Sequence, residues 1–297
     1  MAISGNLPKH LETNARTAVL TSPVRDNFQY LQVAAEIDLT SKTTNLVSLG
    51  GMPTPTNNPK QVDQLIERFK VIEPKDWYLT VSISQNAIDD DQTGTLESQF
   101  RNLNSAFQRH IDTRTFDVLN SGDGQTYGAA YDGQDFFDSD HVDKGASYTT
   151  AQDNEAALTL SLDNFNTAMT AARQFRDDQG NYVNFMYNVL VAHTSLESTA
   201  YNIVGNAQAM DTANREANVW NGRLSYFTRP ELDTTAWYII AASELTKPVI
   251  VGIKKRPTLI DVRFDGTAGD GGVHYFEYHA RYNHIYGDWR SAYQGNT

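Results

Sequence analysis

One stretch of the sequence gathers the residue types from which metal sites and acid–base centres are built. Tyr131–His141 reads YDGQDFFDSDH and places four aspartates and a histidine around two adjacent phenylalanines. A metal-dependent hydrolase would use Asp138, Asp140 and His141 here, since carboxylates and imidazole ligate divalent ions. The calcium-loop pattern D-x-[DN]-x-[DN]-G fails, because Gly133 directly follows the first aspartate and no glutamate closes the loop. The structural alternative is that the phenylalanines anchor a loop in the core and the aspartates cap its turns.

A second candidate for metal chemistry is a series of three histidines near the end of the chain. His274, His279 and His284 follow one another at intervals of five residues. An odd interval places successive side chains on opposite faces of a strand, and five residues are about 140° off one face of a helix. Neither geometry brings the imidazoles together, so we expect no metal site from them. Glu277, His279 and Arg281 do share one strand face, and we expect them to form a polar line across a subunit contact.

Other catalytic signatures are missing from the chain. It has no GxSxG elbow, no GxxxxGK[ST] phosphate loop, no GxGxxG and no HExxH. His193 lies between a predicted buried strand and a helix start, but the sequence places no nucleophile with an orienting acid beside it. We therefore expect no catalytic residue, no cofactor-binding residue and no metal ligand.

The composition is that of a folded, acidic chain. It has 297 residues, of which 40% are hydrophobic and 20% charged, enough for one large domain or two ordinary ones. The formal net charge of −12 disfavours sequence-specific binding to DNA or RNA, because it repels phosphates. The absence of cysteine excludes disulfides and thiol nucleophiles. No run of about 20 apolar residues predicts a membrane span, and the N-terminus lacks the pattern of a secretory signal.

The first part of the chain predicts elements that extend away from a core. Residues 1–44 are polar and weakly periodic, which is typical of an extended arm. Residues 46–62 predict a Gly/Pro-rich loop that is too long for a connection inside a compact domain. Alternating patterns over 64–71 and 77–84, joined by the turn residues Glu73–Asp76, predict a hairpin and hence a projecting β-arm. The residues that we expect at subunit contacts in this region are Gly50, Gly51, Met52, Pro53, Pro55 and Trp77.

Helices and then strands fill the rest of the chain, which predicts an α+β fold. The apolar stripe from Leu96 to Leu119 predicts a helix over about 93–121, roughly 38 Å long. A second helix is expected to begin at a Ser161 cap and to be closed by Gly180. Further strands are expected over 188–192, 237–241, 249–253 and 273–282.

Three local signals predict where other elements begin or turn. Thr194 or Ser195 can cap the helix that follows the first of these strands. Asn221–Gly222 is a strong hairpin signal. The basic run Lys254–Arg256, followed by Pro257, is either an anion contact or a charged strand end that resists edge pairing, and the strand end is the more ordinary interpretation.

Several of these motifs, taken in order, resemble the Mu-type major head subunit family of tailed bacteriophages. YDGQDFFDSDH is similar to the family's DG-x-x-FF-x-x-DH element, and Ile88–Asp91 to the acidic element ahead of its long helix. VLVAHTSLESTA (Val189–Ala200) and AWYII-x6-KP (Ala236–Pro248) are similar to its next blocks, and ARYNHIYGDWRSAY to its ending. The resemblance extends over about residues 25–293. It departs at Phe185–Tyr187, where the family usually has a proline, and it is weakest in the N-terminal arm.

The resemblance implies the major capsid fold shared by tailed phages, herpesviruses and encapsulins. The implied function is structural and not enzymatic: the chain would assemble into pentamers and hexamers that form an icosahedral shell around phage double-stranded DNA. The implied parts are an N-terminal arm (1–44), an extended β-hairpin loop (45–86), a peripheral domain with the spine helix (87–184), an axial domain (185–255) and a return to both domains (256–297).

The same resemblance implies partners and a location. Copies of the chain would be the main partners, with scaffold, portal and decoration proteins as further ones. DNA would be enclosed without sequence-specific binding, and no cofactor or membrane would be involved. The location would be the virion capsid, assembled in the host cytoplasm. The alternatives are an encapsulin-like nanocompartment shell protein and a metal-dependent hydrolase.

Overall fold

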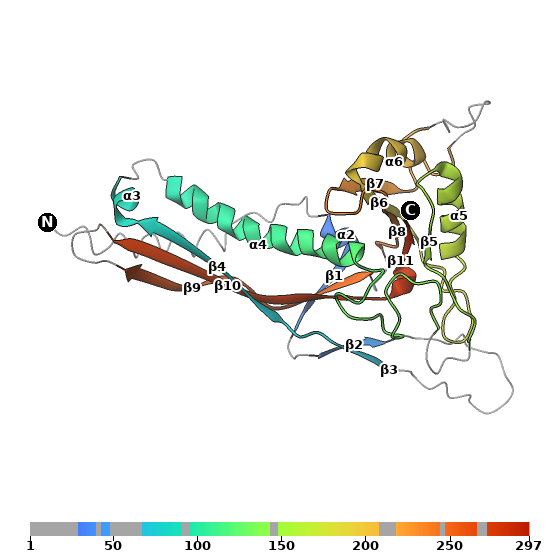
Figure 1. The fold of residues 1–297 in the computed structure, drawn as a ribbon, viewed down its shortest axis with the longest axis horizontal. Coiled ribbons are helices and arrows are strands. Elements are labelled where there is room, and N and C mark those ends of the chain that lie inside the picture. Colours follow the sequence, from blue (N-terminus) through green and yellow to red (C-terminus); the bar gives the residue numbers. More distant parts are fainter. Residues whose placement is uncertain are drawn as a thin grey trace.

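The computed structural model is an elongated molecule with two parts (Figure 1). In one part, helix α4 (Thr95–Asn120) lies along a long, narrow sheet; in the other, helices α5 (Leu162–Ala172) and α6 (Glu197–Val204) flank a five-stranded sheet. The structure describes residues 29–39, 43–47, 67–90, 95–142, 148–207, 218–243, 247–265 and 272–296.

The long sheet has four strands in the order β1-β9-β10-β4. β1 runs parallel to β9, whereas β10 is antiparallel to both of its neighbours. The short helices α2 (Tyr30–Val33) and α3 (Gln85–Asp89) precede β1 and follow β4. The strand bounds are Ala34–Asp38 for β1, Lys75–Ser84 for β4, Val249–Asp265 for β9 and Val273–Tyr286 for β10.

Helix α4 covers one face of the long sheet. It spans 26 residues, so it is about 39 Å long, and it confirms the helix predicted over about 93–121. Its apolar residues Phe107, Ile111 and Phe116 are buried. Along β10, buried and half-exposed residues alternate, which is the pattern of a strand with one packed face and one outward face.

The five-stranded sheet has the order β5-β11-β8-β6-β7. All residues of β8 and β11 are buried, as are the first four of β6, because elements cover the sheet on both sides. On one side of the sheet, Trp237 of β8 lies near Phe165 of α5, with the two ring centroids 6.3 Å apart. The strand bounds are Glu155–Ala156 for β5, Val189–His193 for β6, Ser225–Arg229 for β7, Trp237–Ile240 for β8 and Ala292–Gly295 for β11.

The start of α5 is as predicted, and its end is not. Ser161 caps the helix, since its hydroxyl accepts a hydrogen bond from the Asn164 backbone nitrogen at 3.2 Å. The helix ends at Ala172 and not near Gly180. Gly180, with φ of 91°, instead closes a separate turn in which its backbone nitrogen donates to the Asp177 carbonyl at 3.1 Å.

The predicted cap at Thr194 or Ser195 is wrong. Both residues lie inside a short 3-10 turn, η1 (Thr194–Leu196), which leads into α6. The side chain that caps this turn is His193, whose Nδ1 accepts from the Ser195 backbone nitrogen at 3.1 Å. An imidazole nitrogen can serve as an N-terminal acceptor like the more usual oxygens, and it does so here because His193 ends β6 immediately before the turn.

The predicted hairpin over 64–84 is also wrong in its pairing. β3 (Glu67–Val71) pairs with β2 (Thr43–Val47), while β4 pairs with β10. The chain does not reverse at Glu73–Asp76, because Ile72 is fully buried in a small core with Leu39 and Ile250. Gly252 of β9 makes room for this side chain, since a Cβ there would lie 2.8 Å from an Ile72 methyl group.

Two other local predictions, the hairpin at Asn221–Gly222 and the strand end at the basic run before Pro257, are wrong. Gly222, with φ of 75°, does sit in a turn, but β7 after it pairs in parallel with β6 and makes no hairpin. The basic run before Pro257 does not end a strand, because β9 continues to Asp265. Pro257 lies where the register between β9 and β10 shifts, and a residue at such an irregularity need not donate a ladder hydrogen bond.

The domain boundaries expected from the sequence do not coincide with the boundary between the two sheets. Residues 87–184 contribute α4 to the long sheet and α5 to the five-stranded part, and β9 crosses the expected boundary at 255. The domain boundaries therefore stay predictions. Most of the arm over 1–44, and the loop residues Gly50, Gly51, Met52, Pro53 and Pro55, lie outside the described residues.

Candidate assembly surfaces

The outward face of the long sheet carries a row of paired charges. Glu277, His279 and Arg281 lie on it as the half-exposed residues of β10. Asp76 of β4 joins two of them, because its Oδ1 lies 2.8 Å from His279 Nε2 and 2.8 Å from Arg281 Nε. The structure thus places the predicted polar line on one face, and its role in a subunit contact stays a prediction.

The environment of Asp76 favours its charged form. The hydrogen bond from His279, together with the charge of Arg281, lowers the pKa of the Asp76 carboxyl below its ordinary value. Tyr78 stacks on the His279 ring, with centroids 4.6 Å apart, and is 60% exposed. Lys255 Nζ lies 3.3 Å from His279 Nδ1. Since exposed ion pairs contribute little to folding stability, this ordered row is better suited to meeting another surface.

Sequence reasoning missed Asp76 and Lys255 as members of this row. The alternation along β4 would have placed Asp76 on the face opposite Trp77. It could not show that Asp76 pairs in register with Arg281, since 205 positions separate them. Strand registers over such separations depend on the whole fold, so the row emerges only in three dimensions.

Trp77 lies on the other face of the sheet, beneath α4. Its Nε1 donates to the Tyr282 carbonyl at 3.0 Å, and its ring centroid is 4.4 Å from that of His110. The Arg114 guanidinium lies 5.2 Å from the Trp77 ring. Its described contacts are therefore inside the subunit, and its expected role in a subunit contact stays a prediction.

The two phenylalanines of YDGQDFFDSDH anchor this loop in the core. Phe136 is fully buried and Phe137 is 2% exposed. Phe136 stacks on Tyr286 with ring centroids 4.8 Å apart, and Phe137 lies 5.4 Å from the Tyr238 ring. Tyr286 belongs to the long sheet and Tyr238 to the five-stranded sheet, so this loop fills the junction between the two parts. The structural interpretation of the motif is confirmed.

His141 is the hub of a fully buried polar network at the end of the motif. Its Nδ1 lies 2.6 Å from Asp132 Oδ2 and its Nε2 lies 3.1 Å from Asn154 Oδ1, while its ring stacks on Trp289 at 4.1 Å. The Asn154 amide nitrogen donates to the carbonyls of Phe136 and Trp289, so its oxygen accepts. Both imidazole nitrogens therefore face acceptor atoms, so His141 is held from two sides by Asp132 and Asn154.

This network separates His141 from the two carboxylates that a hydrolytic centre in the motif was expected to use. His141 is held by Asp132 and Asn154, and not by the expected carboxylates. Asp138 Oδ1 instead accepts from the backbone nitrogens of Ser139 and Asp140, at 2.7 and 3.3 Å, so it shapes a turn. Asp140 is exposed and accepts from the side-chain amide of Gln134 at 2.7 Å. The arrangement gives each of these residues a structural partner.

The three histidines of β10 separate as their spacing predicts. His274 hydrogen-bonds Gln85 at 2.6 Å, His279 meets Asp76, and His284 Nε2 donates to the Ile111 carbonyl at 3.3 Å. Over the described residues, no group of three His, Cys, Asp or Glu side chains is placed to hold a metal ion. No helix in the same ranges is long and apolar enough to cross a membrane.

The profile of one protein family, described as phage capsid protein, matches residues 69–295 and so covers strands of both sheets. The chain belongs to the phage capsid protein family. The Mu-like prophage FluMu major head subunit of Haemophilus influenzae is 30% identical to this chain over 115 residues. That match covers 38% of this chain and only 36% of the relative's length. It confirms the resemblance to the Mu-type head subunits.

Solved phage structures share the fold of this capsid family chain. A chain of the bacteriophage JBD30 capsid is 19% identical with a TM-score of 0.57, and the match covers 72% of this chain and 95% of that one. The JBD30 capsid decorated with minor capsid protein trimers gives 20% identity, a TM-score of 0.54 and coverages of 73% and 97%. A chain from Mycobacterium phage Patience is 10% identical with a TM-score of 0.56, covering 100% and 88%. The predicted major capsid fold is confirmed.

Proposed function

We propose that this chain is the major head subunit of a tailed phage. Many copies assemble into pentamers and hexamers, which close an icosahedral shell around double-stranded DNA. The observation that carries the proposal is the family match over residues 69–295, which includes both the long sheet and the five-stranded sheet. The relation to the Mu-like head subunit supports the same role.

The shape of the subunit supports assembly in physical terms. The long sheet is packed by α4 on one face, while its outward face presents the charged row around Asp76. An isolated copy leaves this surface in water, whereas copies related by rotation can cover it in a heterologous contact that closes into a ring. Association of this kind also stabilises each folded subunit through mass action.

The charge of the chain supports a container and not a DNA-binding protein. The net charge of −12 repels phosphates, so the inner wall of the shell would enclose DNA without sequence-specific binding. The role is structural, without catalysis and without a cofactor. The shell assembles in the host cytoplasm and becomes the virion capsid, and scaffold, portal and decoration proteins join it as further partners.

Within this proposal the expected segments take definite roles. Residues 1–44 are an arm, 45–86 an extended loop, 87–184 a peripheral region with the α4 spine, 185–255 an axial region and 256–297 a return to both. β1 and β4 belong to the subunit's own long sheet, and the other residues of the arm and the loop would reach neighbouring copies. The axial region would lie at the centre of each ring.

Electron microscopy of the protein expressed alone tests the proposal. Rings or closed shells are expected, and a protein that stays monomeric at all concentrations, with or without phage proteins, would refute it. Cargo analysis separates the proposal from an encapsulin-like nanocompartment. Particles that contain an enzyme cargo and have no part in DNA packaging would favour the nanocompartment.

A further inference from the structure

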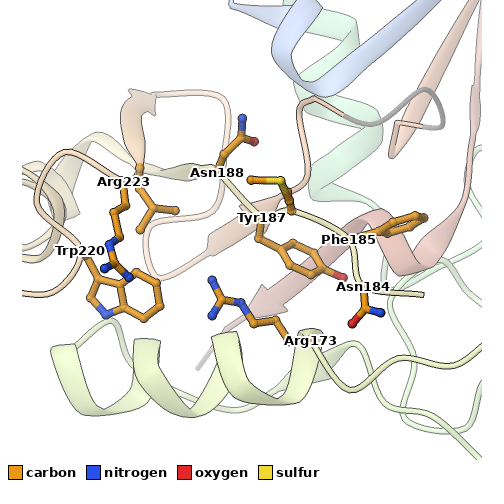
Figure 2. A pocket seen from close by; sticks show the side chains of 9 residues that line it. Arg173, Asn184, Phe185, Tyr187, Asn188, Trp220 and Arg223 are labelled. Carbon is orange, nitrogen blue, oxygen red and sulfur yellow. The ribbon is translucent and has the colours of Figure 1, made fainter. Parts of the chain in front are cut away.

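A cavity with two arginines opens beside the five-stranded sheet. It has a volume of about 440 Å³ and lies between the end of α5 and the segments that lead into β6 and β7. Figure 2 shows the side chains of Arg173 and Arg223 extending toward the same space, with the Trp220 indole and the Tyr187 ring beside them. Two guanidinium groups in one cavity form a receptor for carboxylate or phosphate oxygens.

The cations of this cavity have no acidic partner in the described part of the chain. Arg173 and Arg223 are both exposed and form no ion pair with a described residue. The Arg173 guanidinium lies 5.5 Å from the Trp220 ring, and Trp220 is fixed by a 2.7 Å hydrogen bond from its Nε1 to Asn166 Oδ1. The Arg173 charge therefore lies beside a fixed indole, and neither Arg173 nor Arg223 is neutralised by a described residue.

The rim of the cavity has the composition of a protein contact. Met186 lines it and is 71% exposed, and Val219, next to Trp220, is 61% exposed. Exposed apolar side chains around a Trp and two Arg are typical of the central residues of protein interfaces. The cavity therefore favours a protein carboxylate over a small free anion.

The opposite edge of the same sheet carries the complementary charge. A second cavity, of about 330 Å³, is lined by Asp123, Asp153 and Glu155 beside β5 and β11. Burial raises the pKa of Glu155, and the negative charges of Asp153, Asp138 and Asp123 raise it further. None of these four carboxylates forms an ion pair with a described residue, so this edge lacks a cation.

The basic cavity and the acidic edge of one subunit cannot meet each other. β5 and β7 are the two outer strands of the sheet, separated by four strand intervals. At about 4.8 Å per interval, the separation is roughly 19 Å, and the intervening strands are buried in the core. Only a second copy, rotated relative to the first, can bring the opposite charges together. A contact between two different edges is heterologous, and repeated rotation closes it into a ring.

We propose that the Arg173–Arg223 cavity binds the Asp153 and Glu155 carboxylates of a neighbouring copy and thereby joins adjacent five-stranded sheets within a ring. This inference rests on the proposed assembly of the chain. It deepens that proposal by assigning the two halves of one contact to specific side chains. The exposed Met186 and the Trp220 indole cover the ion pairs from water, which strengthens them relative to pairs at an open surface.

A matched pair of variants tests the basic half of this contact. Arg173→Gln with Arg223→Gln, and Gln174→Glu with Gln179→Glu, each lower the net charge by two, but only the first pair removes cations from the cavity. Sedimentation velocity and negative-stain microscopy measure the fraction of subunits in rings and shells. We expect that fraction to fall about tenfold for the first variant and to stay at the wild-type value for the second. Equal behaviour of both variants would overturn the proposal.

A charge exchange tests the pairing itself. Arg173→Glu with Arg223→Glu should abolish assembly, and so should Asp153→Lys with Glu155→Lys. The variant with all four substitutions restores opposite charges at every contact, in rings of any size, and should assemble to within about threefold of wild type. A four-substitution variant that assembles no better than either half would contradict the pairing.

Folding controls and the assembly of the wild type distinguish a failure of this contact from a failure of the proposed function. Each variant should unfold at the wild-type temperature, and the neutral changes Asp153→Asn and Glu155→Gln replace any reversal that fails to fold. If wild type assembles and the variants assemble equally well, this contact is wrong while the proposed function stands. If wild type never assembles, the proposed function itself fails. Normal assembly with less packaged DNA would assign the cavity to phosphates instead.

Discussion

The two parts of the molecule bury their strands in different ways. In the five-stranded sheet, all residues of β8 and β11 are buried, and the same holds for most of β6. In the long sheet, β10 alternates between buried and half-exposed residues, and the outer half of β9 is largely exposed. The first part has the close packing of a complete core, and the second keeps one face in contact with water.

This difference indicates how the subunit divides its tasks. Stability comes mainly from the part in which strands are covered on both sides, because apolar burial is the main favourable contribution to folding. The long sheet, with its spine helix on one face, has an extended outward face, which the proposed assembly would cover with other copies. Mutations of buried residues in the five-stranded part should therefore affect folding most, whereas mutations on exposed faces of either part should affect stability little.

The largest loss of stability is expected from Trp237→Ala. This side chain is fully buried, and Gly295 lies so close that a Cβ there would come within 2.1 Å of the indole. Removing it leaves a large cavity and should cost about 4 kcal/mol of the free energy of unfolding, measured by urea denaturation. Tyr78→Ala, on the outward face of the long sheet, should cost less than about 0.5 kcal/mol. Equal losses of stability in Trp237→Ala and Tyr78→Ala would contradict the difference in burial between the two parts.

A slightly smaller loss is expected from Asp132→Asn. The change removes a carboxylate oxygen from the buried network, where Asp132 Oδ2 lies 2.6 Å from His141 Nδ1. Disrupting this buried carboxylate–imidazole contact from one side should cost about 3 kcal/mol, again measured by urea denaturation. Asp140→Asn is the control, since Asp140 is exposed in the same loop. Equal stability of the two variants would show that the Asp132–His141 contact contributes little to folding.

A smaller, pH-dependent effect is expected at His284. Burial under α4, helped by the positive charge of Arg114, lowers the pKa of this imidazole to about 3. In the unfolded chain, this imidazole binds a proton as the pH falls through about 6.5. The contribution of His284 to the free energy of unfolding is therefore fully present well above that pH and falls by about 1.4 kcal/mol per pH unit below it. Urea denaturation at pH 7 and pH 5 should therefore show a loss of about 2 kcal/mol at this residue.

The variant His284→Phe isolates that contribution. The other titrating groups are present in both proteins, and among them His110 of α4 also lowers the pKa of His284 through its positive charge. The variant should be less stable at pH 7, because it loses the hydrogen bond to the Ile111 carbonyl. Its stability should decline less between pH 7 and pH 5 than that of wild type. Parallel pH profiles would show that His284 does not titrate below its ordinary range.

The smallest effect on stability is expected from deleting residues Gly50–Lys60. Shortening a loop changes its closure entropy by less than about 1 kcal/mol. The subunit should keep its thermal unfolding temperature, yet it should fail to form closed shells in negative-stain images. Intact shells from the deletion would refute the role proposed for the loop, and a lower unfolding temperature would place the loop among the elements that support the fold.

Features that depend on nearby residues could be predicted from the sequence. The long helix follows from its apolar stripe, and the start of α5 from the hydroxyl of Ser161. The role of Phe136 and Phe137 as core anchors follows from two adjacent aromatic residues in a polar loop. In each case, the signal and the structure that it specifies lie within a few turns of chain.

Features that depend on distant partners could not be predicted in this way. β4 was expected to pair with the strand just before it, but Ile72 enters a core that Leu39 and Ile250 complete from other segments. The network around His141 needs Asp132, Asn154 and Trp289 together, and no spacing rule links them. Partner choice over such distances is decided by the packing of the whole molecule.

The irregular ladder between β9 and β10 has a consequence for particle geometry. Three register shifts fall within Glu277–Tyr282, next to the row of charges around Asp76. Such bulges bend a strand and increase its local twist, so the two ends of this sheet point in directions that the bulges set. In a shell built from fivefold and sixfold rings, the angle between adjacent subunits fixes the radius. A bend of a few degrees in this short segment, repeated in every copy, would determine how large a particle the protein can close.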